Sequence, residues 1–504
     1  MAESALAEAV VAEDKRKELI DAASYRKACI ILDKDGVFPE LIDVHAVADM
    51  LIKDLHIRTI RETKELLFYY DGKHNHYGEI FIDGILVRVF SGIKTRKCRE
   101  IYNASTVRKE IIERIKAKTY TRLVDFDADL NIINMANGLY DIQSGAFMEH
   151  DPSYPSLIQI PVVYDPAATC PNIDKMIETV AAAHNRTMLY EFIVYCLHRK
   201  YPIQKILVLL GPGQTGKSYF MDVVKRILGI DNCSSVSIQE LAEDKYASSD
   251  LHMKMANICG DLDASAIKQA GILKKLTSNK DTIRAQRKHE RSFDFVNYAK
   301  LIYGANQLPP SNDATTGFYR RFDICPFLHI FKDGEDNQEF LDSLTSESEI
   351  SGLFNKVVGL LPALLERGKF TNALSVEETR ILYETLSSPE EAFFTQFVME
   401  EPGRFTPKDA LWVYYREYCK ELSIDVKSTR SKTAFGRYIT QNIEWIKRRA
   451  IRDDKEGQAS NFSTRIDGKS TAAWPDTYFD LKTFNNRTKP EAKPRVTIAK
   501  KSIG

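Results

Sequence analysis

The sequence predicts an α/β protein whose central part is a parallel sheet covered by helices. Three observations support this fold class. The short apolar run Ile206–Leu210 is followed by a glycine-rich turn and then by a helical pattern that ends before Gly229. From Pro202 to about Phe331, strand-like and helical patterns alternate, which is typical of parallel strands joined by crossover helices. A helical pattern over residues 170–200 precedes this alternation.

The composition fits a globular chain of several domains. It has 504 residues, of which 44% are hydrophobic and 28% charged, and the prior for this length is about three domains. The 70 basic and 70 acidic residues give a net charge of +0, so any nucleic-acid site must be a local basic surface.

The cysteines and the start of the chain bear on the compartment. The eight cysteines form no C-x-x-C pair, which argues against a zinc ribbon or a disulfide framework and favours a reducing compartment. The first residues lack a signal-peptide pattern, and Ile206–Leu210 is too short to cross a bilayer. We therefore expect a protein of the host cell cytoplasm with no membrane partner.

The patterns divide the chain into successive parts. These are a leader (1–23), a mixed α/β region (24–119), a loop-rich and helical region (120–200), the α/β core (201–387), a small C-terminal domain (388–484) and a basic tail expected to be disordered (485–504). In the mixed region the runs LLFYYDG and EIFIDGILVRVF are strand-like, and further on Asp141 begins a compact turn that ends at Gly145.

Three aspartates in the loop-rich region suggest a calcium loop, but the rest of the pattern is missing. Asp125, Asp127 and Asp129 have the spacing, whereas Leu130 and Ala136 replace the loop glycine and the terminal glutamate. A primase metal pair is also disfavoured, because no supporting histidine or basic cluster follows. The structural interpretation of these aspartates is preferred.

The glycine-rich turn has the pattern of a phosphate-binding P-loop. Glycines there allow the backbone N–H groups and the helix N-terminus to approach phosphates closely. Lys217 is expected to bind the β- and γ-phosphates, and the Ser218 hydroxyl a magnesium ion. A chance match is the alternative, which the flanking strand and helix make improbable. ATP is preferred to GTP because no guanine-reading motif is visible, and the expected cofactors are ATP and Mg²⁺. The nucleotide-binding residues are Gly211, Pro212, Gly213, Gln214, Thr215, Gly216, Lys217 and Ser218.

Polar residues after the next two strands complete the predicted catalytic set. The apolar run MANIC leads to Asp261, which is expected to hold magnesium, and to Asp263, which could polarise the attacking water. The two aspartates could exchange roles, and Asp263 could instead cap a helix. The run AKLIYGAN ends in Asn306, expected to orient the water.

Two adjacent arginines follow, and one of them is the candidate arginine finger. An arginine supplied across a subunit boundary commonly stabilises charge on a transferring phosphoryl group. Arg320 and Arg321 both fit this role, a surface salt bridge is the alternative for either, and the sequence does not choose between them.

The order of these motifs resembles the superfamily 3 helicases, specifically the phage, plasmid and poxvirus primase-helicase family. The resembling segments are INMANGLYDIQSG, GPGQTGKS, ICGDLD, KKLTSNKDTIRAQRKHERSFDF, YGANQLP and YRRFDICPF. The resemblance implies an AAA+-like ATPase core, an N-terminal helicase-associated region, a C-terminal winged-helix-like domain, and a ring, usually a hexamer, that translocates on single-stranded DNA. Asp261 departs from the family, which often has glutamate there.

Two basic segments are candidate DNA-binding sites. TIRAQRKHERSFDF can form a hairpin, and the family has its DNA-gripping hairpin here, although a solvated basic turn is the alternative. Its basic residues are Arg284, Arg287, Lys288, His289 and Arg291. The C-terminal domain could bind a duplex or origin DNA, with a solvated helix face equally plausible, through Arg430, Lys432, Arg437, Lys447, Arg448 and Arg449.

These expectations combine into one leading function and several alternatives. The leading hypothesis is an ATP-dependent replicative DNA helicase of a virus, plasmid or integrated element, acting as a homo-hexamer on single-stranded and forked DNA with a primase or polymerase partner. An ATP-switched DNA-binding initiator or assembly factor is the main alternative. A ring ATPase acting on RNA or on a packaging substrate is another, and a small-molecule kinase is least favoured. No primase site is evident in the first hundred residues.

Overall fold

The computed structural model describes residues 20–91, 93, 105–262, 267, 271–311, 313, 315–331, 338–422, 431–443, 446, 463–466 and 469–480. The greater part of the predicted leader, the whole basic tail, Asp263, Arg430 and Lys447 to Arg449 lie outside these residues. The chain forms two compact units, Met1–Thr169 with Ile227–Asn232 and Ile350–Pro362, and Cys170–Arg226 with Cys233–Glu349 and Ala363–Gly504.

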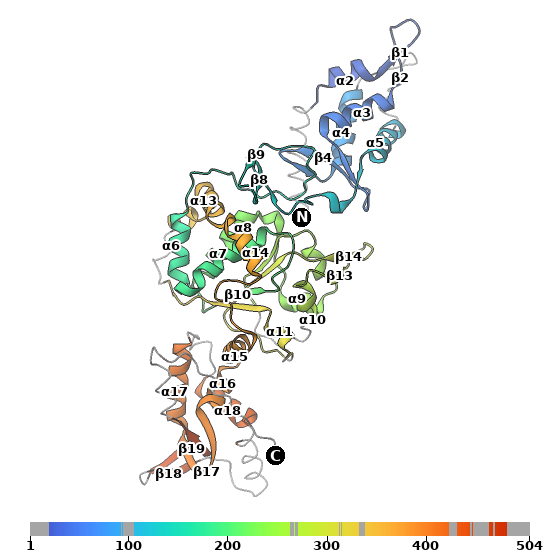
Figure 1. Ribbon diagram of the computed structural model, residues 1–504. Coiled ribbons are helices and arrows are strands. Elements are labelled where there is room, and N and C mark those ends of the chain that lie inside the picture. The colour runs from blue at the N-terminus through green and yellow to red at the C-terminus, as the bar shows by residue number, and fades with distance from the viewer. Residues whose placement is uncertain are drawn as a thin grey trace. The chain divides into compact units, whose positions relative to one another are not determined.

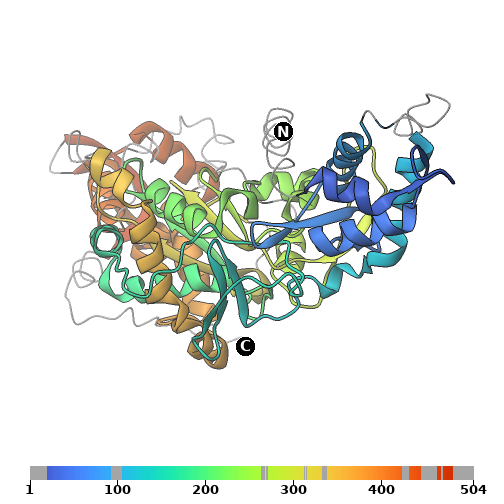
Figure 2. The same cartoon turned by 90° about the horizontal axis from the view of Figure 1, so that it is seen from above.

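The first unit contains a small sheet with helices packed against it (Figure 1, Figure 2). The strand order is β5-β4-β3-β6, and a second sheet has the order β7-β8-β9. The core is formed by apolar side chains from α3, α4 and α5 with those of the strands. The elements are α2 (Ala22–Cys29), β1 (Ile30–Leu32), β2 (Pro39–Ile42), α3 (Val44–Leu55), β3 (Arg58–Ile60), β4 (Leu66–Tyr70), β5 (Lys73–Asn75), α4 (Gly78–Phe90), α5 (Ser105–Thr119), β6 (Tyr120–Thr121), β7 (Ile132–Met135), β8 (Gly138–Asp141) and β9 (Phe147–Met148).

One strand prediction in this unit is wrong. The run EIFIDGILVRVF is helix α4, not a strand, whereas LLFYYDG contains β4 as expected. The buried residues of α4, among them Phe81, Ile85 and Val89, recur at helical spacing and face the core. Short apolar runs with few polar interruptions do not distinguish a buried helix from a buried strand, which explains the error.

The loop-rich region follows the predicted turn. The Asp141 carbonyl accepts from the Gly145 N–H at 2.8 Å, and the Asp141 carboxylate accepts from the Gln143 N–H at 2.8 Å. Asp127 is buried and accepts from the Ser156 hydroxyl at 2.6 Å and from the Leu157 N–H at 2.8 Å. Asp127 therefore has a structural role in holding this loop.

The second unit contains the predicted parallel sheet, with the order β11-β12-β15-β10-β16 and every pairing parallel. All residues of β10 and β15 are buried, as expected for strands covered on both faces. The elements are α6 (Pro171–Val180), α7 (Ala183–Leu197), β10 (Ile206–Leu210), α8 (Lys217–Leu228), β11 (Cys233–Ser234), α9 (Ile238–Glu243), β12 (Ala256–Cys259), α10 (Gly271–Leu276), β13 (Thr282–Ala285), β14 (Phe293–Val296), β15 (Lys300–Ala305), α11 (Thr316–Tyr319), β16 (Phe322–Pro326), α12 (Gln338–Ser343) and α15 (Val376–Ser387). Most of α13 (Glu347–Val358) and the start of α14 (Leu360–Arg367) belong to the first unit.

In its described residues, the C-terminal segment combines helices with an antiparallel sheet (Figure 1). Its elements are α16 (Pro389–Phe397), β17 (Val398–Pro407), α17 (Lys408–Glu421), α18 (Lys432–Asn442), β18 (Ser463–Ile466) and β19 (Lys469–Phe479). The sheet order is β17-β19-β18, and an aromatic core that includes Phe393, Tyr415 and Trp474 joins it to the helices. The predicted helices followed by a β-hairpin are present.

Among the described residues, no single helix is long and apolar enough to span a membrane. The bent pair α13 and α14 meets the limits of length and composition only when its two helices are taken together.

Candidate nucleotide and nucleic-acid sites

The glycine-rich loop joins β10 to α8 at the carboxyl end of the sheet. Its first residue, Gly211, donates its N–H to the Ala305 carbonyl at 3.0 Å, so the loop begins against the end of β15. A Cβ on Gly211 would lie 2.4 Å from the Phe327 backbone oxygen, so only glycine fits there. Gln214 and Gly216 have positive φ values of 63° and 84°, which fold the loop back toward the helix. In parallel sheets, ligands bind outside this edge.

Lys217 is the centre of the contacts in this loop. It is the first residue of α8 and is 9% exposed. Its Nζ donates to the Pro212 carbonyl at 2.7 Å and to the Asn306 Oδ1 at 3.1 Å. Burial lowers the pKa of Lys217, and the charge of Asp261 opposes this shift. The structure therefore brings together the predicted phosphate-binding lysine, Asn306 and Asp261.

These three side chains meet because their strands are neighbours. β15 lies between β10 and β12, so the loop after β10, Asn306 after β15 and Asp261 after β12 emerge at one edge. The Leu262 N–H donates to the Gly304 carbonyl at 2.9 Å and holds the segment after β12 against β15. Asp261 and Ser218 are both exposed and offer the hard oxygen ligands that Mg²⁺ prefers.

The loop has both the open space and the polar partners that a phosphate group requires. No atom lies within 4 Å of a Cβ built on Gly213, so the exposed backbone there is open to a ligand. The buried Lys217 ammonium is held by carbonyl and amide oxygens, partners that phosphate oxygens can replace. These residues can accommodate phosphate groups together with a hard divalent cation.

The two adjacent arginines lie in opposite environments. Arg320 is exposed and donates to the Gln204 Oε1 at 3.0 Å. Arg321 is 6% exposed and donates to the Thr277 hydroxyl at 2.7 Å and to the Lys274 carbonyl at 3.2 Å. Arg320 can therefore reach a neighbouring molecule, whereas Arg321 is committed within this chain.

The predicted basic hairpin is present as β13 and β14. Its antiparallel register pairs Arg284 with Asp294, and Figure 1 shows the connecting loop extending away from α9 and α10. Arg284, Arg287, Lys288, His289 and Arg291 are all exposed. His289 has a φ of 68°, in the left-handed region, so it occupies the turn itself.

Aromatic rings pack against strand β14 of this hairpin, below the turn. His252 lies edge-on to Phe293 and Phe295, with ring centroids 4.9 and 5.2 Å apart. Burial and the nearby Arg287 lower the pKa of His252 to about 4. Arg287 lies 5.3 Å from the centre of the Phe293 ring. His252 was not among the predicted site residues, because it precedes β13 in the chain and only the fold brings it to the hairpin.

A basic hollow in the C-terminal segment includes Lys432 and Arg437, two of the predicted cations, and adds Lys408, which was not predicted. It has a volume of about 470 Å³ and is lined by Lys408, Lys432, Arg437 and Trp474, among others. The Lys408 Nζ lies 4.5 Å from the centre of the Trp474 ring, and Lys432 pairs with Asp409 at 2.5 Å. Lys408 and Lys432 each begin a helix, where a cation is unfavourable for the helix dipole. A lysine at the start of a predicted helix is therefore the sequence signal that could have indicated this basic hollow.

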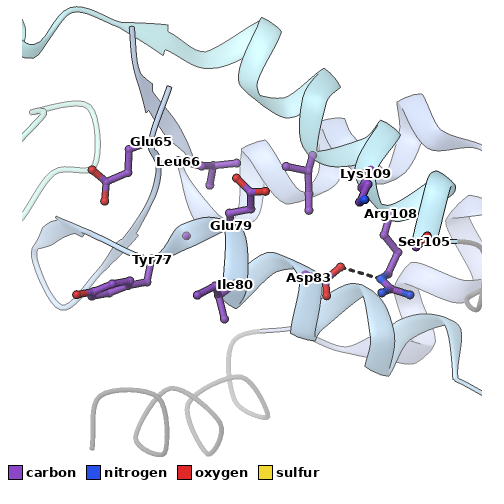
Figure 3. A pocket seen from close by; sticks show the side chains of 11 residues that line it. Glu65, Leu66, Tyr77, Glu79, Ile80, Asp83, Ser105, Arg108 and Lys109 are labelled. Carbon is purple, nitrogen blue, oxygen red and sulfur yellow. Dashed lines mark hydrogen bonds and ion pairs between the residues drawn. The ribbon is translucent and has the colours of Figure 1, made fainter. Parts of the chain in front are cut away.

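A second hollow, of about 550 Å³, lies in the first unit between β4, α4 and α5 (Figure 3). Among its charged lining residues, Arg108 and Asp83 are 2.7 Å apart, and Glu79 lies 2.8 Å from Lys116. Tyr77 at its rim has a φ of 63°. None of the predicted site residues lines this hollow.

Comparison with known proteins gives two family matches on parts of the chain. Residues 46–181 match a family described as D5 N terminal like. Residues 209–321, which include the loop, Asp261, Asn306 and both arginines, match a family of unknown function (DUF5906). The first match covers much of the mixed α/β region, for which the sequence analysis assigned no role.

The individual relatives share low sequence identity with this chain. The chain is 26% identical over 223 residues to "Putative helicase L207/L206" of Acanthamoeba polyphaga mimivirus, covering 42% of this chain and 23% of that protein. Two apo structures of the NrS-1 C-terminal region each align with 13% identity and a TM-score of 0.40, covering 85% and 84% of this chain and 98% and 97% of theirs. The chain is thus related in sequence to a viral protein named as a helicase, and the structural likeness is too low to carry a conclusion.

Proposed function

We propose that this protein is an ATP-dependent DNA helicase of superfamily 3 that replicates the genome of a virus, plasmid or integrated element. The observation that carries the proposal is the convergence of Lys217, Asn306 and Asp261 beside a glycine-rich loop at one edge of a parallel sheet. The family match over 209–321 and the viral relative named as a helicase support it.

In this proposal each residue at the sheet edge has a separate role in ATP hydrolysis. Lys217 leaves its carbonyl and amide partners to bind the β- and γ-phosphates. Ser218 and Asp261 hold Mg²⁺, which neutralises charge on the phosphates when bound. Asn306, released from Lys217, orients the attacking water, with Asp263 as the second carboxylate. Arg320, whose guanidinium is exposed, serves as the finger toward the nucleotide of a neighbouring subunit. This requires an oligomer, for which we propose a hexameric ring.

The hairpin supplies the proposed contact with single-stranded DNA. Lys288, His289 and Arg291 are exposed at a turn whose base is fixed by aromatic packing. A cationic tip on a fixed base can track phosphates in a ring channel. A primase or polymerase partner, a forked DNA substrate and a winged-helix role for the C-terminal segment complete the proposal.

The first test is ATP hydrolysis by the wild type and Lys217→Ala, with and without single-stranded DNA, together with the native mass. We expect an oligomer whose turnover rises with DNA and is lost in the variant. Lys225→Ala, on the exposed side of the same helix, is the matched control and should retain turnover. The helicase function would be contradicted if ATP turnover did not change with DNA and the protein could not unwind a forked duplex. Competition between DNA and RNA in stimulating ATP hydrolysis shows which of the two nucleic acids the protein acts on.

A second candidate function is favoured by the basic hollow of the C-terminal segment. Three cations from two helices surround it, an arrangement suited to phosphate groups of a duplex. If the protein is an ATP-switched initiator, Lys217→Ala should abolish ring assembly while the wild type shows negligible turnover. Lys432→Ala with Arg437→Ala should then remove duplex binding.

A further inference from the structure

Arg321 links two elements that the proposed function uses separately. Its Nε donates to the Thr277 hydroxyl at 2.7 Å, a second nitrogen donates to the Lys274 carbonyl at 3.2 Å, and a third donates to the Gly317 carbonyl. Thr277 has no exposed surface and follows directly on α10, whereas Gly317 lies in α11. One guanidinium therefore joins the end of α10 to the helix that precedes Arg320.

A second contact joins the same two helices. The Lys274 Nζ lies 2.6 Å from the Asp313 carboxylate and donates to the Thr315 hydroxyl at 3.0 Å. Thr315 stands immediately before α11 and also donates to Asp313 at 2.6 Å. α10 and α11 are thus connected by Lys274, which lies in α10, and by Arg321, which follows α11, and these contacts resist independent movement of either helix.

The end of α10 is in turn attached to the hairpin. The Asn297 side chain, which follows β14, donates to the Leu276 carbonyl at 2.7 Å. Asn297 is 1% exposed, and β13 begins at Thr282, shortly after Thr277. Both strands of the hairpin therefore leave from the segment that Arg321 holds.

We infer that Arg321 is a positioning residue that couples Arg320 to the DNA-binding hairpin. This inference rests on the proposed function. Because Arg320 and Arg321 are consecutive, displacement of the Arg320 backbone by a nucleotide in the neighbouring subunit moves the buried guanidinium. The rigid fork of Arg321 carries that movement to Thr277 and so to the hairpin. The same link returns the effect of DNA at the hairpin to the ATP site, because coupling between binding sites is reciprocal.

The test uses Thr277→Val, which removes the hydroxyl partner of Arg321 and keeps the shape of the side chain. Four quantities are measured: thermal stability, basal ATP turnover, single-stranded DNA affinity, and the ratio of DNA-stimulated to basal turnover. We expect the ratio to fall by about 5-fold or more, the lower end of typical coupling between sites. Basal turnover should stay within about 2-fold of wild type.

Thr379→Val is the matched control. Thr379 is also buried in the same unit, and its hydroxyl donates to the Ser375 carbonyl at 2.9 Å, as the Thr277 hydroxyl does to the Leu273 carbonyl at 2.8 Å. Among the described residues, no arginine donates to the Thr379 hydroxyl. Thr379→Val should lower stability less than Thr277→Val, because no buried arginine loses a partner, and it should leave the stimulation ratio unchanged. Arg321→Lys, which keeps the charge but loses the fork, should lower the ratio as Thr277→Val does.

The outcomes separate the inference from the proposed function. If the wild type is not stimulated by DNA, the helicase function fails before the coupling is tested. If the wild type is stimulated and both valine variants keep the full ratio, Arg321 is structural and the inference is overturned. If Arg321→Lys abolishes basal turnover while Thr277→Val keeps the wild-type ratio, Arg321 is itself the finger and the inference is equally overturned.

Discussion

The glycine-rich loop and the hairpin tip are both short polar turns, but the chain fixes them to different degrees. The loop surrounds a buried lysine whose Nζ contacts Pro212 and Asn306, and its first glycine is pressed against backbone. The tip is held by its own turn, with the Glu290 N–H donating to the Arg287 carbonyl at 3.1 Å, and its cationic ends are exposed. If the proposed function holds, the comparison predicts a nucleotide site that is formed in advance and a DNA site that adapts to the strand.

Arg320→Ala gives the largest expected effect outside the loop and tests whether the preformed site is complete in one subunit. Removing an arginine finger typically lowers turnover by about 10³-fold or more. Because Arg320 is exposed, thermal stability should not change. Steady-state ATP hydrolysis measures the loss, and Arg226→Ala, another exposed arginine of the same unit, is the control. Turnover within about tenfold of wild type would show that no finger acts from this position.

Gly211→Ala and Gly213→Ala sharpen the comparison within the loop itself. A Cβ on Gly211 meets the Phe327 oxygen at 2.4 Å, so we expect a loss of about 1–3 kcal/mol in the free energy of unfolding. Gly213 has no neighbour within 4 Å, so its alanine variant should unfold like wild type and lose only ATP affinity. Thermal unfolding with and without ATP measures both. Equal destabilisation by the two changes would contradict the described loop.

The hairpin tip should behave in the opposite way, losing ligand affinity without losing stability. The combined change Lys288→Ala, His289→Ala and Arg291→Ala should weaken single-stranded DNA binding and reduce its salt dependence. The slope of log K against log[salt] should decrease by roughly 0.7 for each phosphate that the tip no longer neutralises. Fluorescence anisotropy at several salt concentrations measures this slope.

The control for the tip lies in the C-terminal segment. Lys432→Ala with Arg437→Ala changes as many permanent cations but lies at the basic hollow. It should leave the single-strand slope intact. If the two sets of changes lower the slope equally, the tip has no special role and both variants act only through overall charge.

The sequence predicts local elements well where pattern and turn chemistry agree. The strand Ile206–Leu210, the basic hairpin and the turn from Asp141 to Gly145 all follow from short-range rules. It fails at α4, because an apolar run without clear period fits either element. The environments of Arg320 and Arg321 are beyond sequence reasoning for a different reason. Burial of one guanidinium depends on Thr277 and Lys274, which reach it only through the fold.

His252, packed below the turn of the hairpin, supplies the smallest expected effect, a pH dependence of stability. Burial against Phe293 and Phe295, with Arg287 nearby, lowers the pKa of His252 from 6.5 to about 4. Because the folded-state pKa is below the unfolded value, the unfolded chain binds the proton more tightly. Stability is therefore full above about pH 6.5 and is lost as the pH falls from there toward 4.

His252→Phe removes this proton-binding site while keeping a ring against the two phenylalanines. Between pH 7.5 and 5.5 the wild type should lose on the order of 1 kcal/mol more than the variant, after allowance for solvent screening of a partly exposed ring. Urea unfolding at the two pH values measures the difference. Identical losses would mean that His252 is solvated, and the hairpin base would then be as adaptable as its tip. A larger loss of unfolding free energy in the wild type would instead show that the aromatic contacts around His252 are fixed. The adaptable part of the hairpin would then begin above these contacts, at the turn.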